Sequence, residues 1–258
     1  MSSASEPKIL ELRKVSFSYS RQRPLITELS LSVGEGEFIG LLGANGSGKS
    51  TILKLGSGIL SPSQGEVLLW SKPLKTYQNR DRAKLISYLP QMLDIAVPFT
   101  VQELVGMGLY PYDIPPVMSV DSALELVGLQ DKASAYLSDL SGGEKRRTFI
   151  AMTLVQGAGL LMLDEPLANL DIKYQIELVR LLKKLRDAKN ISVIMALHDI
   201  NIALQFSKVM LVKNGELLGI GTPEDILTDE LLLEAFDVQV TIMRHADGSS
   251  FIRYGAEN

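Results

Sequence analysis

The sequence predicts an α/β fold in which an antiparallel β-rich part and a helical insertion are attached to a core of alternating strands and helices. Three observations predict it. Short β-like runs separated by turns fill the start of the chain, a glycine-rich loop lies between an apolar strand and a helix, and strand–helix alternation returns after a proline-broken stretch. The chain has 258 residues, of which 46% are hydrophobic and 22% charged, so it is long and apolar enough to bury a large core.

The β-rich part comes first along the chain. Predicted strands cover 9–17, 29–33, 38–42, 67–70 and 85–89. One helix interrupts them, and we expect it to run from Lys49 to about Leu60, where Ser61 and Pro62 end it. The first ninety residues therefore read as strands wrapped around one strand–loop–helix unit.

The character of the chain changes after Gln91. Prolines break the stretch that follows, and 121–127 and 143–156 look helical. We expect a single domain over 1–258. In it, 1–91 and 158–258 form the core with its β-subdomain, and 92–157 form an inserted helical subdomain.

Strand and helix alternate again in the last part of the chain. Strands are predicted at 160–163, 191–197 and 209–212, and a helix at 173–189. Asn214-Gly215 predicts a tight hairpin turn, and Thr222 followed by Pro223 predicts a capped helix start. We expect one apolar face of the long helix to dock on a sheet. That face consists of Ile172, Ile176, Val179, Leu182 and Leu185.

Composition disfavours a nucleic-acid binder and excludes cysteine-based chemistry. A formal net charge of −4 gives no basic excess to follow a nucleic-acid backbone, and the absence of cysteine removes disulfides and thiolate chemistry. The start, MSSASEPK, has neither the basic nor the apolar region of a signal peptide. Apolar runs such as 160–163 and 191–197 are far shorter than the ~20 residues of a membrane-spanning helix. We expect any membrane role to act from the cytoplasmic side through partner subunits.

The strongest local motif is the glycine-rich loop at 43–51, GANGSGKST. It fits the phosphate-binding pattern G-x-x-x-x-G-K-[ST] and lies between an apolar strand and a helix. Backbone N–H groups of such a loop surround phosphates, Lys49 would reach the β- and γ-phosphates, and Ser50 would bind Mg²⁺. The motif predicts a P-loop NTPase core. A chance glycine turn is the alternative, which the strand–helix context disfavours.

The apolar strand at 160–163 ends in two acids, Asp164 and Glu165. A buried strand would carry Asp164 to the magnesium ion, and Glu165 would act as general base on the attacking water. Strands often end in acids that only cap them. Downstream of a phosphate loop, the catalytic interpretation is favoured.

A second helix start is encoded at 140–144, LSGGE. Ser141 and Glu144 have the spacing of a capping box, so a helix begins here with glycines exposing its positive end. This pattern predicts a second phosphate-binding surface. The basic run that follows, Lys145-Arg146-Arg147, is interpreted as solvated charge on the helix surface, with Arg147 as a candidate structural residue.

With these two motifs the sequence resembles the nucleotide-binding domains of ATP-binding cassette (ABC) proteins over essentially its whole length. The resemblance implies ATP and Mg²⁺ as cofactors, with Ser50, Gln91 and Asp164 at the metal. It implies catalytic roles for Glu165, His198 and Gln91, and adenine stacking on Tyr19. The other residues that it assigns to the nucleotide are Gly43, Asn45, Gly46, Gly48, Lys49, Thr51, Ser141, Gly142, Gly143 and Asp171.

The resemblance also implies partners. Two copies would sandwich two Mg-ATP, with the phosphate loop of one facing Ser141, Gly142 and Gly143 of the other. Asp171 lies in the loop that crosses to the partner, where Leu167-Ala168-Asn169 replace the usual small hydroxylated residue, a change expected to be tolerated. The segments 98–105 and 108–111 are similar to cassettes of importers for iron-siderophores, haem and cobalamin. Such a cassette lies on the cytoplasmic face of the inner membrane and works with multi-span permease subunits and an extracytoplasmic substrate-binding protein.

Three other functions remain open at this point. The chain could serve an exporter or another class of importer, because the core chemistry is the same. A soluble ABC ATPase acting on nucleic acid is disfavoured, because such proteins usually join two cassettes or insert long coiled coils. A single-site P-loop kinase is opposed by the motif at 141–144.

Overall fold

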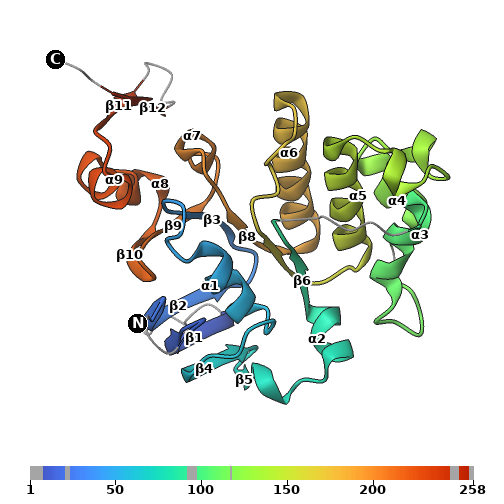
Figure 1. Cartoon of the computed structure of the whole chain (residues 1–258), viewed down its shortest axis with the longest axis horizontal. Helices are drawn as coiled ribbons and strands as arrows, with labels where there is room; N and C mark the ends of the chain where they lie inside the picture. Colours follow the sequence, from blue (N-terminus) through green and yellow to red (C-terminus); the bar gives the residue numbers. More distant parts are fainter. Residues whose placement is uncertain (1–7, 21–23, 92–97, 117, 245–249, 256–258) are drawn as a thin grey trace. The chain divides into compact units, whose positions relative to one another are not determined.

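The computed structural model describes residues 8–20, 24–91, 98–116, 118–244 and 250–255 (Figure 1). Within it the chain forms two compact units, Met1–Pro73 with Ile194–Asn258, and Leu74–Val193. The predicted helical subdomain at 92–157 falls within the second unit, although 92–97 and 117 lie outside the described residues. Each unit is built around its own buried strands.

The first unit contains an antiparallel sheet with strand order β2-β1-β4-β5, as predicted for the β-rich part. Its strands are β1 (Lys8–Phe17), β2 (Ile26–Gly34), β4 (Gln64–Leu69) and β5 (Lys72–Pro73). Leu12 pairs with Leu31 on one side and with Val67 on the other. Aliphatic side chains of neighbouring strands therefore cover one another across the sheet.

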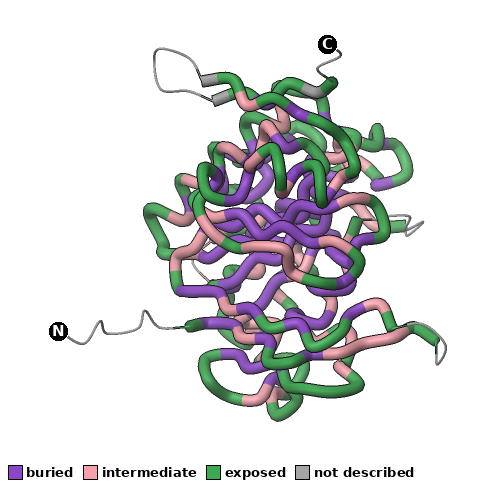
Figure 2. The backbone as a smooth tube through the Cα atoms, turned by 90° about the vertical axis from the view of Figure 1, so that its left-hand side faces the viewer, coloured by how far each residue is buried: buried purple, intermediate pink, exposed green. Residues whose placement is uncertain are grey.

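A second group of strands in this unit has the order β10-β9-β3-β8. They are β3 (Phe38–Leu42), β8 (Ser192–Ala196), β9 (Lys208–Lys213) and β10 (Glu216–Gly221). The strands β3 and β9 are parallel, whereas the predicted Asn214-Gly215 turn joins β9 and β10 as an antiparallel hairpin. All residues of β3 and β8 are buried, and Figure 2 colours the buried stretches of the chain purple. Strands buried on both faces read as continuous apolar runs.

Helices and one hairpin complete the first unit. They are α1 (Lys49–Gly56), α7 (Ile200–Ala203), α8 (Pro223–Ile226), α9 (Asp229–Phe236), and the pair β11 (Val240–Arg244) and β12 (Ser250–Tyr254). The predicted cap of α8 is present, because the Thr222 hydroxyl accepts a hydrogen bond from the Asp225 N–H. The end of α1 was predicted four residues too late. Gly58 adopts a φ of 74°, and the N–H groups of Ile59 and Leu60 bond the Lys54 carbonyl, which closes the helix early.

The second unit pairs β6 (Ile86–Leu89) in parallel with β7 (Leu160–Leu163). Its helices are α2 (Asn79–Leu85), α3 (Val101–Gly106), α4 (Val120–Leu126), α5 (Gly142–Val155) and α6 (Ile172–Lys189), with single turns η1 (Leu74–Thr76), η2 (Met107–Leu109), η3 (Gln130–Lys132) and η4 (Leu137–Asp139). The helices α3, α4 and α5 pack against one another (Figure 1). None of the described helices is long and apolar enough to cross a membrane.

The predicted apolar face of α6 is only partly buried. Val179, Leu182 and Leu185 are buried, but Ile172 and Ile176 are 74% and 42% exposed. The periodicity of a sequence indicates which side of a helix is apolar. It does not indicate along what length of the helix other elements pack against that side. The prediction for the first two turns was therefore wrong.

Candidate functional site

The phosphate loop connects β3 to α1 through a turn that requires glycine. A Cβ on Gly43 would lie 2.2 Å from the Val212 carbonyl oxygen. Gly48, the residue before α1, has a φ of 106°, and no side chain caps the helix. A helix start of this kind, preceded by a glycine-rich turn and without a side-chain cap, is a common binding place for a phosphate group.

Lys49 is the first residue of α1, directly after the glycines of this loop, and is only 5% exposed. Its ammonium group donates hydrogen bonds to the carbonyl oxygens of Gly43, at 2.8 Å, and Ala44, at 3.2 Å. The hydroxyl of Ser47 is buried without a hydrogen-bond partner. A buried cation, an unsatisfied hydroxyl and an uncapped helix start without acids in its first turn fit a polyphosphate such as that of ATP.

Tyr19 lies beside the phosphate loop in the first unit. Its hydroxyl lies 3.3 Å from the Thr51 hydroxyl on α1, and its ring meets Phe17 edge-on at 4.9 Å. The side chain is 63% exposed, which excludes the alternative that it is a core aromatic. An exposed, held ring is suited to stack on a planar base.

His198 follows β8 at the same end of the strands as the phosphate loop. The Leu197 N–H bonds the Leu41 carbonyl at 3.0 Å, so the chain leaves β8 beside the end of β3. His198 itself is exposed. Within the first unit, the predicted residues Tyr19, Lys49, Thr51 and His198 therefore occur on segments that border one loop.

The acidic residues lie in the second unit, where β6 and β7 end together. Leu89 pairs with Leu163, so Gln91 and the Asp164-Glu165 pair leave the same edge. The Gln91 amide donates to the Glu165 carboxylate, and the Tyr88 hydroxyl donates to Asp164 at 3.2 Å. Asp164 and Glu165 are 1% and 7% exposed. The amide and carboxylate that the sequence singled out are thus in direct contact.

The interpretation of the basic run as solvated surface was wrong for Arg146, whereas the burial of Arg147 agrees with its being a candidate structural residue. Arg146 and Arg147 are 4% and 9% exposed. Burial lowers the pKa of the Arg146 guanidinium, while Asp164 and Glu165 oppose that shift by their charge. A signal was present in the sequence, because Arg146 precedes the buried Phe149 and Ile150 by three and four residues and so shares their helix face.

The start of α5 carries the predicted capping box. The Ser141 hydroxyl accepts from the Glu144 N–H, and the Glu144 carboxylate accepts from the Ser141 N–H at 2.9 Å. Lys132 donates to the same carboxylate, and these bonds lower the pKa of Glu144 from 4.5 to about 2. Gly142 is exposed, and a Cβ there would touch nothing within 4 Å.

The loop that ends in Asp171 runs beside this helix start. A Cβ on Gly143 would lie 3.4 Å from the Asn169 carbonyl oxygen. The Gln175 amide donates to the carbonyl groups of Leu167 and Leu170 and holds the loop. Asp171 precedes α6, is exposed and makes no capping bond with its side chain.

The predicted magnesium ligands are one hydroxyl, one amide and one carboxylate. Among the described residues there is no group of three or more His, Cys, Asp or Glu side chains that could hold a metal. Such a group is not required, because Mg²⁺ bound with a nucleotide takes phosphate oxygens and water in addition to one or two carboxylates. The donor chemistry of Ser50 and Asp164 fits that ion.

Known proteins are similar to this chain over most of its length. The family model described as ABC transporter matches residues 26–168. The petrobactin import ATP-binding protein FpuC of Bacillus anthracis is 36% identical over 251 residues, covering 94% of this chain and 92% of the relative. The hemin import ATP-binding protein HmuV of Nitrobacter winogradskyi is 39% identical over 235 residues, covering 87% of each.

A solved structure is similar in fold as well. It is the dimeric structure of a post-hydrolysis state of an ATP-binding cassette, bound to ADP and Pi. It has a TM-score of 0.75 and 25% identity, and the match covers 83% of this chain and 98% of that one.

Proposed function

The chain belongs to the ABC transporter family and is an ATPase, and we propose that it powers an importer of a metal chelate such as a ferric siderophore, haem or cobalamin. Support for import comes from the relatives at 36% and 39% identity, which are named for petrobactin and hemin import. The structural observation that carries the ATPase site is the uncapped start of α1 beside the buried Lys49.

Binding of ATP is the first step of the proposal. Lys49 and the N–H groups at the start of α1 take the phosphates, which replace the carbonyl partners of the ammonium group. Tyr19 supports the adenine ring. Ser50, Gln91 and Asp164 would hold Mg²⁺, which would neutralise charge on the phosphates.

Hydrolysis depends on the residues at the strand ends. Glu165 accepts a proton from the attacking water, and Gln91, whose amide contacts the Glu165 carboxylate, orients that water. His198 contacts the γ-phosphate. The Gln91–Glu165 contact supports a common role for these two side chains.

A second copy of the chain completes each site. The exposed Gly142 and the positive end of α5 are available to the γ-phosphate bound by the partner, and Asp171 lies in the neighbouring loop. Closure on ATP and reopening after hydrolysis then move the membrane subunits. The chain acts at the cytoplasmic face of the inner membrane, and an extracytoplasmic binding protein supplies the cargo.

The permease contact is proposed for the Gln91 segment and 92–112, of which 92–97 lie outside the described residues. Exposed apolar side chains support it: Tyr110 and Met107 within this stretch are 85% and 41% exposed, and Ile114, two residues after it, is 84% exposed. Arg80 braces this segment by donating to the Pro111 carbonyl at 2.9 Å and pairing with Asp113. An exposed apolar group on a braced loop suits a short helix of a membrane partner.

A trapping experiment tests the ATPase proposal. In Glu165→Gln the side chain keeps its size but cannot take the proton, so hydrolysis should fall by about 10²–10⁴-fold while ATP still binds. Size-exclusion chromatography with saturating Mg-ATP should then show a stable dimer. Two results together would contradict the shared site. The Glu165→Gln variant would stay monomeric, and the wild-type turnover per chain would be independent of protein concentration.

A transport experiment tests the cargo class. A strain that lacks this protein should lose uptake of one iron chelate, haem or cobalamin, and should keep sugar and amino-acid uptake. A selective sugar defect would contradict the chelate assignment but not the ATPase.

The permease contact has a separate test. Substitution of Tyr110 and Ile114 by serine should lower transport while the isolated chain keeps its ATPase activity.

A further inference from the structure

Arg146 uses all of its hydrogen-bonding capacity on main-chain carbonyl groups. A guanidinium has five N–H donors in one plane. Its Nε donates to Pro166, Nη1 to Pro90 and Gln91, and Nη2 to Asp164 and Glu165, at distances from 2.6 to 3.3 Å. Five donors therefore meet five carbonyl oxygens, in a side chain that is 4% exposed.

These carbonyl groups belong to two segments that carry the chemistry. Pro90 and Gln91 follow β6, and the segment from Asp164 to Pro166 follows β7. Glu165 has a φ of 50°, a conformation that non-glycine residues adopt only where the surroundings hold them in it. Hydrogen bonds from Arg146 to the carbonyls on either side of the Glu165–Pro166 peptide provide such a constraint.

We propose that Arg146 is a positioning residue for hydrolysis, which fixes the main chain of Gln91 and Glu165 so that the amide and the carboxylate meet. The inference rests on the proposed function, because it gives Glu165 the role of base. Arg146 lies in the second turn of α5, so within one chain it also connects that helix to the main chain that carries the catalytic carboxylate. A displacement of the helix start then moves the base with it.

Only arginine satisfies this arrangement. Lysine keeps the charge but offers three donors from one point, and glutamine offers two. Neither reaches five acceptors distributed over a plane. Carbonyl oxygens left without a donor in this buried place would turn toward other donors, and the backbone at Glu165 would shift with them.

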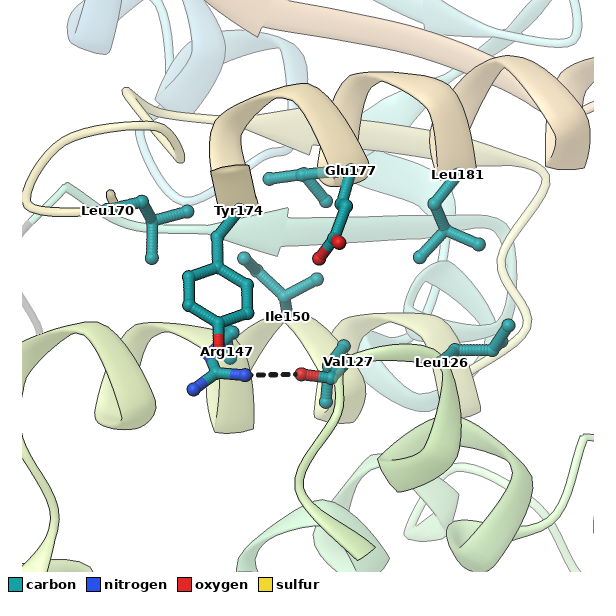
Figure 3. Close-up of a pocket in the computed structure, with 9 residues that line it drawn as sticks. Leu126, Val127, Arg147, Ile150, Leu170, Tyr174, Glu177 and Leu181 are labelled. Atoms are coloured by element: carbon teal, nitrogen blue, oxygen red, sulfur yellow. Dashed lines mark hydrogen bonds between the residues drawn. The ribbon is translucent and has the colours of Figure 1, made fainter. Parts of the chain in front are cut away.

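Arg147 provides a matched control on the same helix. It is also buried, and its Nη1 donates to the carbonyl group of Val127, as Figure 3 shows, and to that of Gly128. Its guanidinium carbon lies 3.9 Å from the centre of the Tyr174 ring. These contacts connect α5 to the end of α4 and to α6, and none of them involves the Gln91 or Glu165 segments.

The test compares Arg146→Lys and Arg146→Gln with Arg147→Lys in the full chain. Displacement of a catalytic group by about 1 Å costs on the order of 10²-fold. We expect kcat for ATP to fall by about that factor in both Arg146 variants, with KM and the affinity for a fluorescent ATP analogue changed less than about threefold. Arg147→Lys should lower thermal stability but leave kcat within about threefold of wild type.

A double substitution separates positioning from general destabilisation. If Arg146 acts through Glu165, then Arg146→Lys should not lower further the residual single-turnover rate of Glu165→Gln. Additive losses, a normal kcat in Arg146→Lys, or equal kcat losses in the Arg146 and Arg147 variants would each overturn the inference. If Arg146→Gln fails to fold, Arg146→Lys decides, and failure of both variants to fold would assign Arg146 a structural role only. Wild-type activity in Glu165→Gln alone would instead refute the proposed function.

Discussion

The two glycine-rich helix starts of this chain differ in whether their own side chains neutralise the positive end of the helix. The start of α1 has no side-chain cap and no acid in its first turn, and it is followed by the buried Lys49. The start of α5 is capped by Ser141 and carries Glu144, whose carboxylate bonds the helix end and Lys132. One is open to an anion, and the other is already partly neutralised.

The difference indicates unequal roles. A helix start without a side-chain cap that also carries a lysine can bind a phosphate group by itself, since it offers both backbone N–H donors and a positive charge. A helix start that holds its own carboxylate has less attraction left for an anion, so it is suited to complete a site that another surface has formed. This agrees with the proposal that α5 contacts ATP already bound by the partner.

The largest effect should come from the first helix start. Lys49→Ala removes the cation from the phosphate loop, and we expect kcat/KM for ATP to fall by about 10²–10³-fold, the range for loss of one preorganised charge donor. Lys54→Ala is the matched control, because Lys54 lies in the last turn of the same helix. Steady-state ATPase assays of both variants measure the difference. Equal losses would mean that general charge, and not the phosphate loop, is responsible.

Mixed dimers test whether the two helix starts act on one nucleotide. A Lys49→Ala chain mixed with a Ser141→Ala chain can form one intact site and one doubly defective site. With random pairing, half of the dimers are mixed, so activity should recover to about a quarter of wild type if the sites act independently. Strict coupling between the two sites would suppress that recovery. ATPase activity measured across mixing ratios gives the answer, and a peak at equal amounts would show complementation.

A smaller effect is expected for Ser141→Ala alone. Loss of the cap should cost about 1 kcal/mol of stability, and loss of a hydrogen bond to phosphate, about 1.5–3 kcal/mol, should lower kcat/KM by about 10–10²-fold. Thr100→Ala is the control, because Thr100 caps α3 with the same capping box. Urea unfolding should give similar losses for both variants, whereas only Ser141→Ala should lower ATPase activity.

The smallest effect concerns Glu144 and is visible as pH dependence. Its folded pKa is about 2, below the ordinary 4.5, so its ionised form is favoured by folding. The stabilisation is fully present above pH 4.5 and is lost as the pH falls toward 2. Glu144→Gln, which can still form a capping box, should be less stable than wild type at pH 7 and should approach it at pH 3. A constant difference in urea midpoint between those pH values would contradict this.

Much of the site could be predicted because its signals are local. The glycines of the phosphate loop, the capping box from Ser141 to Glu144 and the Asn214-Gly215 turn each depend on residues within a few positions of one another. Backbone conformations that only glycine tolerates, and hydrogen bonds across three residues, can be recognised from sequence alone. The apolar strand before Asp164 is local in the same sense.

Other features depend on segments that are distant in sequence. The burial of Ile172 and Ile176 was overestimated because the reach of neighbouring elements along α6 is not encoded in the periodicity of that helix. The early end of α1 depends on the positive φ of Gly58. Sequence alone did not identify this glycine as the one that ends the helix. Whether Tyr19 was core or surface was likewise decided by packing, which leaves its ring exposed beside Thr51.

The sequence by itself determined the strand–loop–helix units, the caps and the types of chemical group at their ends, because these depend on contacts within a single turn. Only the tertiary structure decided what Arg146 does. Its carbonyl acceptors lie between 18 and 56 residues away along the chain. A buried guanidinium is stable only when such distant carbonyl groups converge on it, and that convergence exists only once the segments after β6 and β7 are folded against α5.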